Sequence, residues 1–146
     1  MIYPLASMLG GKLADSYGRK RLIMLFDTLA ALLYLACGFI QPSITLIYVI
    51  LSASACMSIA GPAHDSLIAD LTVPENRAGA YALSYMGWNI GFAIGPMLGG
   101  RFLNSSSVES AWLLVGGISM VSATFMFVLE KYEKKTKTVA EEALEA

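Results

Sequence analysis

The sequence predicts an all-α membrane protein with four complete transmembrane helices and part of another. Of its 146 residues, 56% are hydrophobic and only 14% are charged, whereas a soluble domain carries about 25% charged residues. The charges gather in short segments between long uncharged runs, and a membrane helix needs about 20 apolar residues to cross the bilayer. The net charge of −1 argues against nucleic acid as a partner, because nucleic-acid-binding surfaces are basic.

The apolar runs can be taken in chain order. Residues 1–11 are too short to span a bilayer, and we interpret them as the cytosolic half of a helix that begins outside this sequence. The four runs predicted to span are 22–40, 44–63, 78–100 and 111–129. Residues 72–75 have the spacing of a capping box with proline in the first turn, which predicts a helix start. Residues 130–146 are polar and are predicted to be a cytosolic tail that can be helical.

The distribution of Lys and Arg predicts the orientation. If the four spans alternate, nine of these residues fall on one side of the membrane and only Arg101 on the other. Because cytosolic loops carry the excess of Lys and Arg, the segment after residue 11 and the tail are predicted to be cytosolic. Residues 41–43 and 101–110 then face outward. The predicted location is the cell membrane, with several passes through the lipid bilayer.

Residues 11–21, GKLADSYGRKR, form a short polar segment that we expect to be a loop. Asp15 and Arg19 lie four residues apart, and Gly18 supplies the permissive backbone that a tight turn needs. The segment resembles the signature G-x-L-a-D-r-x-G-r-k of the major facilitator superfamily of secondary transporters, found between that family's second and third membrane helices. Ser16 departs from the signature, since the family usually has a basic residue there.

A second signature lies in the run 78–100. Its GFAIGPMLGG segment, residues 91–100, resembles the fifth-helix signature G-x-x-x-G-P-x-x-G-G of the same family, which is associated with antiporters that include drug exporters. Glycine recurs every four residues, which predicts a shallow groove that lets a neighbouring backbone approach closely, and the proline is expected to bend the helix. An ordinary helix-packing face is the alternative. The residues of this helix-packing signature are Gly87, Gly91, Gly95, Pro96, Gly99 and Gly100.

The resemblance implies a partial major-facilitator helical bundle. Residues 1–129 would hold family helices two to six of the N-terminal half, and 130–146 the central linker, so the first helix and the C-terminal half would lie outside this sequence. The implied function is export of drug-like small molecules by antiport against protons. The alternatives are a uniporter or symporter of sugars or metabolites, and a non-transporting membrane fragment or interaction module. Drug exporters often carry an arginine where this chain has residues 51–56, which contain none.

The resemblance also implies a cytosolic gate. Asp15 would pair with basic residues of its own segment and with the other half of the transporter, and Asp70 would engage the arginine of the segment. Anchoring to lipid phosphates is the alternative for the basic residues. The residues of the gate signature are Gly11, Asp15, Gly18, Arg19, Lys20 and Asp70.

Several polar residues inside the apolar runs are further candidates. Asp27 is predicted to form an ion pair with the nearby cations, with proton carriage as the alternative. Ser54 and Ser58 share a helical face that either lines a substrate cavity or packs against a neighbour. Asn89 is predicted to bridge helices or bind substrate, and His64 to be solvated. We expect no metal site, no cofactor and no enzymatic activity, because no nucleophile and base cluster along the chain.

Overall fold

The computed structural model describes the backbone of residues 2–105 and 107–145, and the side chains of 6–102 and 107–131. Within these ranges the chain is helical and has no strand. Its elements are α1 (Ile2–Tyr17), α2 (Arg19–Cys37), α3 (Ile44–Leu71), the short 3-10 helix η1 (Pro74–Asn76), α4 (Arg77–Ser105) and α5 (Val108–Glu145).

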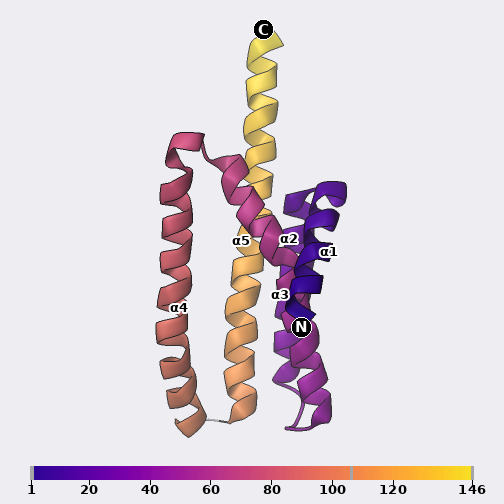
Figure 1. Cartoon of the computed structure of the whole chain (residues 1–146), viewed down its shortest axis with the longest axis vertical. Helices are drawn as coiled ribbons and strands as arrows, with labels where there is room; N and C mark the ends of the chain where they lie inside the picture. Colours follow the sequence, from indigo (N-terminus) through magenta and orange to yellow (C-terminus); the bar gives the residue numbers. More distant parts are fainter. Residues whose placement is uncertain (1, 106, 146) are drawn as a thin grey trace.

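Four of the helices pack together and one stands apart. The main contacts join α2 to α3, α2 to α5 and α1 to α3. Helix α4 is attached at its two ends, through η1 and through the connection to α5, and runs beside the other helices (Figure 1). Most of its side chains are exposed. The helical group therefore consists of α1, α2, α3 and α5, with α4 as an outlying member.

The core between the packed helices is built mainly from small residues. Ala14, Leu22, Ile23 and Ala63 are buried together at the junction of α1, α2 and α3. Three glycines allow helices to approach still more closely. A Cβ at Gly10 would collide with the Ile59 backbone, and one at Gly116 with the backbone and side chain of Leu35. At Gly38 a Cβ would meet the Leu113 side chain.

Two of the four predicted spans are long and apolar enough to cross a membrane on their own. Among the described residues these are α3 and the part of α5 from Val108 to Lys131. Helix α2 ends at Cys37 and starts with three basic residues, so its uncharged part is short and Asp27 interrupts it. Helix α4 carries glycines and the polar Asn89, which lower its hydropathy. The prediction of four complete spans is therefore met by α3 and α5 but not by α2 and α4.

The predicted boundaries change at three places. Helix α3 continues past residue 63 to Leu71, and α5 joins the predicted span and the polar tail into one helix. The capping box at 72–75 was wrong, because the Thr72 hydroxyl donates to the Ile68 carbonyl of the preceding helix at 2.6 Å. The prediction of Pro74 in the first turn of a new helix is confirmed, although that turn is the 3-10 helix η1.

Candidate functional site

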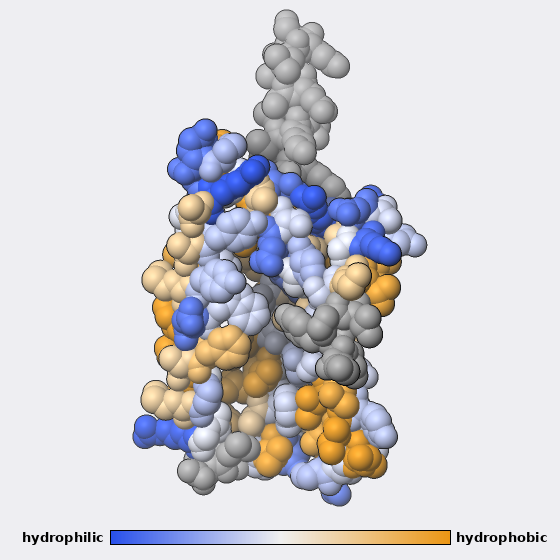
Figure 2. All heavy atoms as spheres, viewed as in Figure 1, coloured by the Kyte–Doolittle hydropathy of each residue, from blue (hydrophilic) through white to orange (hydrophobic). Residues whose placement is uncertain are grey.

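The candidate site lies at the end of the molecule that carries the α1–α2 turn, the end of α3 and η1 (Figure 1). The connections from α2 to α3 and from α4 to α5 lie at the opposite end (Figure 1). Hydrophilic residues gather around the first end, and hydrophobic side chains cover much of the lower part of the same face (Figure 2).

The α1–α2 turn is much tighter than the predicted loop. Residues 11–17 continue α1, and Gly18 is the one residue between the two helices. Its φ of 87° is in the region that glycine adopts without steric cost, which confirms the predicted role of Gly18. The Gly18 amide donates to the Ala14 carbonyl at 3.0 Å, and the Leu22 amide donates to the Gly18 carbonyl at 3.1 Å. The expectation of a loop was wrong because the polar side chains of 11–17 lie on an exposed helix end.

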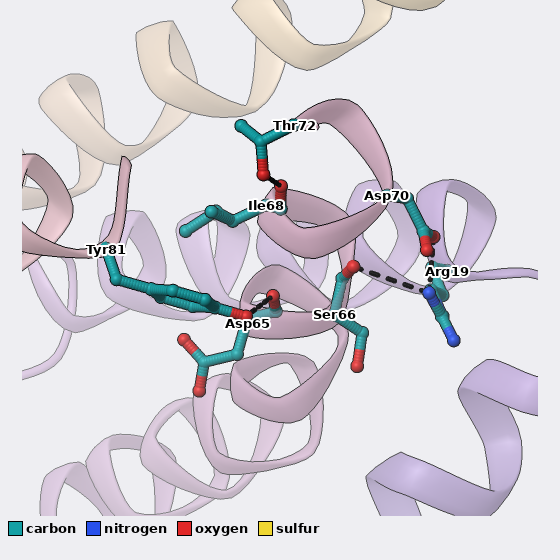
Figure 3. A network of polar contacts seen from close by, with 7 residues as sticks. All are labelled: Arg19, Asp65, Ser66, Ile68, Asp70, Thr72 and Tyr81. Atoms are coloured by element: carbon teal, nitrogen blue, oxygen red, sulfur yellow. Dashed lines mark hydrogen bonds and ion pairs between the residues drawn. The ribbon is translucent and has the colours of Figure 1, made fainter. Parts of the chain in front are cut away.

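Arg19 connects the start of α2 to the end of α3. Its guanidinium forms an ion pair with the Asp70 carboxylate, and the same Nη1 donates to the Ser66 carbonyl at 3.3 Å (Figure 3). The Arg19 and Asp70 side chains are 34% and 51% exposed, so the pair contributes only about 0–1 kcal/mol. Its main consequence is geometric, since it holds the α1–α2 turn against the last turns of α3.

Tyr81 connects α4 to the same part of α3. Its hydroxyl donates to the Asp65 carbonyl at 2.8 Å, so the consecutive carbonyls of Asp65 and Ser66 accept hydrogen bonds from two different helices (Figure 3). The sequence analysis missed Tyr81, because a tyrosine near the start of an apolar helix also fits an interfacial aromatic.

An open groove runs beside the ion pair. Its volume is about 540 Å³, and it is lined by both basic and acidic side chains. Lys20 lines it together with Arg19 and Asp70. Asp15 is exposed one turn earlier on α1, and it forms no ion pair within the part of the chain that the structure describes. The groove is lined by Tyr17, Gly18, Arg19, Lys20, Arg21, Leu67, Asp70, Leu71 and Glu130.

The glycine signature of α4 makes no close helix contact in this chain. A Cβ added at any of its five glycines would meet nothing within 4 Å. The predicted groove is present as a shallow depression lined by Ser84, Gly87, Trp88 and Gly91, beside a stacked Trp88–Phe92 pair with centroids 5.9 Å apart. The close approaches occur elsewhere, at Gly10, Gly38 and Gly116. The expected neighbouring backbone is therefore absent among the described residues.

The predicted cavity residues do not meet. Ser58 is buried and its hydroxyl donates to the Ser54 carbonyl at 2.8 Å, whereas Ser54 is exposed. Asn89 is also exposed, and its amide donates to the Tyr85 carbonyl of its own helix at 2.7 Å. The prediction that Asn89 bridges helices is wrong in this structure, because α4 stands away from the other helices. Neither groove described above is lined by these three residues.

Asp27 and His64 form a pair between α2 and α3. Asp27 Oδ2 lies 3.0 Å from His64 Nε2. Both predictions for these residues were wrong, since the partner of Asp27 is not a cation of the α1–α2 segment and His64 is not simply solvated. Asp27 lies two turns into α2, away from the basic residues at the start of that helix. Its contact with His64 shows that it faces α3.

Comparison with known proteins agrees with the two signatures. A sequence model of the Major Facilitator Superfamily matches residues 1–146. The chain is 35% identical over 105 residues, 70% of its length, to YqjV, an MFS-type transporter of Bacillus subtilis, and covers 25% of that protein. It is 28% identical over 137 residues, 90% of its length, to a Na(+), Li(+), K(+)/H(+) antiporter of Planococcus maritimus, covering 31% of that protein.

A third relative is a multi-drug resistance efflux pump PmrA homolog of Lactococcus lactis. The identity is 26% over 132 residues, which are 90% of this chain and 33% of the pump. The chain thus spans between a quarter and a third of the length of these curated relatives. No solved structure matches the chain significantly.

Proposed function

Because the chain belongs to the major facilitator superfamily, we propose that it forms part of the N-terminal helical bundle of a membrane transporter that exports drug-like small molecules in exchange for protons. The observation that carries the proposal is that the chain has both family signatures and that Arg19, in the first of them, pairs with Asp70. The names of two relatives, an antiporter and an efflux pump, support antiport and export.

In this proposal the end of the molecule with the Gly18 turn is the cytosolic gate. Arg19 and Asp70 fix the turn to α3, and Asp15 is left exposed to engage the second helical bundle of the transporter. Lys20 contributes positive charge to the same groove. In this proposal the glycine face of α4 is open because the helices that would pack on it are supplied by the rest of the transporter. Alternating access then moves one bundle against the other around a central site.

The proposed orientation predicts the labelling of single cysteines. A cysteine at Ser16 should react only with reagent added on the cytosolic side, and one at Ser110, at the start of α5, only with reagent added outside. Membrane-impermeant maleimide applied to intact cells and to inverted vesicles measures this. Labelling of the Ser110 cysteine from the cytosolic side alone would reverse the orientation.

The transport function predicts activity in a chimera with the Lactococcus lactis efflux pump homolog. Residues of this chain would replace the 132 matching positions of the relative, which supplies the remaining helices. We expect export of fluorescent cationic dyes, driven by an imposed pH gradient. Asp15→Asn should reduce that export at least about tenfold while leaving the amount in the membrane unchanged, whereas Ser16→Asn, at the neighbouring position where this chain departs from the signature, should have little effect.

Other outcomes of this experiment separate the alternatives. Uptake of sugars or organic acids by the chimera, without dye export, would favour a metabolite transporter. A chimera that reaches the membrane in normal amount and moves none of these compounds would contradict the transport proposal and favour a non-transporting fragment.

A further inference from the structure

The Asp27–His64 pair has no part in the proposed gate. Asp27 lies on α2 and His64 on α3, and the Asp27 and His64 side chains are 15% and 41% exposed. The pair joins the two helices that share the most extensive contact among the described residues. One partner is therefore almost enclosed between helices, and the other reaches the surface of the bundle.

Only one oxygen of the Asp27 carboxylate has a partner. Within the described residues the other, Oδ1, is buried without a hydrogen bond, and so is the hydroxyl oxygen of the adjacent Thr28. Buried polar atoms in proteins almost always have hydrogen-bond partners, and a buried ionised carboxylate without enough donors is strongly disfavoured. The Asp27 carboxylate therefore has one buried oxygen, Oδ1, whose hydrogen-bonding capacity no described group uses.

One proton is enough to bring the net charge of the pair to zero. When a neutral His64 ring donates from Nε2 to Oδ2, the pair carries a net charge of −1. A second proton on the His64 ring, at Nδ1, produces an imidazolium beside a carboxylate, and a proton on Asp27 Oδ1 produces a neutral acid beside a neutral ring. In both cases the net charge becomes zero. Because His64 is the more exposed partner, its ring is the route by which the proton enters.

The charged groups on the surrounding helices lie toward the helix ends. Between residues 110 and 129, α5 has no titratable side chain, and its nearest acids in the described part are Glu109 and Glu130. The carboxylate next to His64 in sequence is Asp65, which is exposed. The remaining charged groups in the described part of these four helices are Lys12 and Asp15 on α1, Arg19, Lys20 and Arg21 at the start of α2, Asp70 at the end of α3, and Lys131 on α5.

We propose that Asp27 and His64 form a proton-binding site between α2 and α3, with the proton held on the His64 ring and the buried Asp27 carboxylate as its partner. The site takes up one proton, and its net charge changes from −1 to zero. The proposal concerns this pair alone, so it stands or falls independently of the substrate and of the direction of transport.

His64 is the one histidine in the sequence, so nitrogen NMR of the full chain labelled with ¹⁵N-histidine reports this site directly. The chain in lipid nanodiscs would be titrated between about pH 5 and 8, where histidine changes charge. At a fixed pH in this range, Asp27→Asn should lower the ratio of protonated to neutral His64 about tenfold or more, because an opposite charge in contact favours the protonated ring. An unchanged ratio would overturn the proposal.

Asp65→Asn is the matched control, because it removes an exposed carboxylate next to His64 in sequence and leaves the pair intact. It should change the ratio less than about twofold, since exposed charges are screened. Equal effects of the two variants would show that the general field, not the pair, holds the proton. Replacing N-methylglucamine chloride by sodium chloride should change nothing, and a sodium-dependent loss of the proton that requires Asp27 would show a cation site instead.

The wild-type chain decides the question if Asp27→Asn does not fold. Its Nε2 signal should be that of a nitrogen bearing hydrogen across the whole range, and both ring nitrogens should bear hydrogen at the acidic end. A bare Nε2 at neutral pH would mean that Asp27 and not His64 carries the hydrogen of this contact, and it would overturn the assignment of the proton to His64.

Discussion

Gly10→Ala is expected to destabilise the packing of α1 on α3 by about 1–3 kcal/mol, the usual cost of forcing extra volume into a packed contact. The added Cβ would collide with the Ile59 backbone, which belongs to a helix and has no side-chain rotamer through which it can move away. Thermal unfolding of the chain in detergent, followed by circular dichroism, measures the loss.

Gly11→Ala provides a control one residue further along the same helix. A Cβ at Gly11 meets nothing within 4 Å, and alanine is better than glycine inside a helix by about 1 kcal/mol. This variant should therefore be neutral or slightly stabilised. Equal unfolding temperatures for the two variants would show that α1 and α3 do not approach each other as closely as the structure has them.

The glycines of α4 and Gly10 of α1 also show how much of the helix packing could be predicted from the sequence. The recurrence of glycine from Gly87 to Gly99 is visible in the sequence, and it predicts a face without bulk. It does not identify the helix that packs there, and this chain leaves the face open. Gly10 has an alanine four residues before it and another four residues after it, Ala6 and Ala14, and both are buried. This small-residue spacing fits a close helix contact, but it does not identify the partner, which depends on the crossing of α1 and α3.

The polar pairs show the same division. The charge distribution predicts that Arg19 and Asp70 lie at the same end of the bundle, because both follow an apolar run by a few residues. The contact between Asp27 and His64 could not be predicted in this way, since it depends on the rotation of α2 and α3 about their axes. The cations nearest in sequence were therefore the expected partners of Asp27, and the one histidine was expected to be solvated.

Reversal of the Asp70 charge is expected to separate the α1–α2 turn from the end of α3. Asp70→Arg replaces an attraction of about 0–1 kcal/mol by repulsion between two cations, so the population of separated conformers should rise about tenfold, which corresponds to about 1.4 kcal/mol. Spin labels at the exposed positions Ser16 and Glu75 would report the distance between the two segments. Asp65→Arg, on the same stretch of α3 but outside the ion pair, is the control and should leave the distance distribution unchanged.

The double variant Arg19→Asp with Asp70→Arg decides what Arg19 does. It restores opposite charges across the contact, although the hydrogen bond from Arg19 to the Ser66 carbonyl is lost, so recovery should be substantial but incomplete. If Arg19 instead serves to anchor α2 to lipid phosphates, an aspartate at its position repels those phosphates, and the double variant should be worse than either single one. The same set of variants in the chimera described above should lose and regain dye export in parallel with the distance, because a gate requires the pair and an anchor does not.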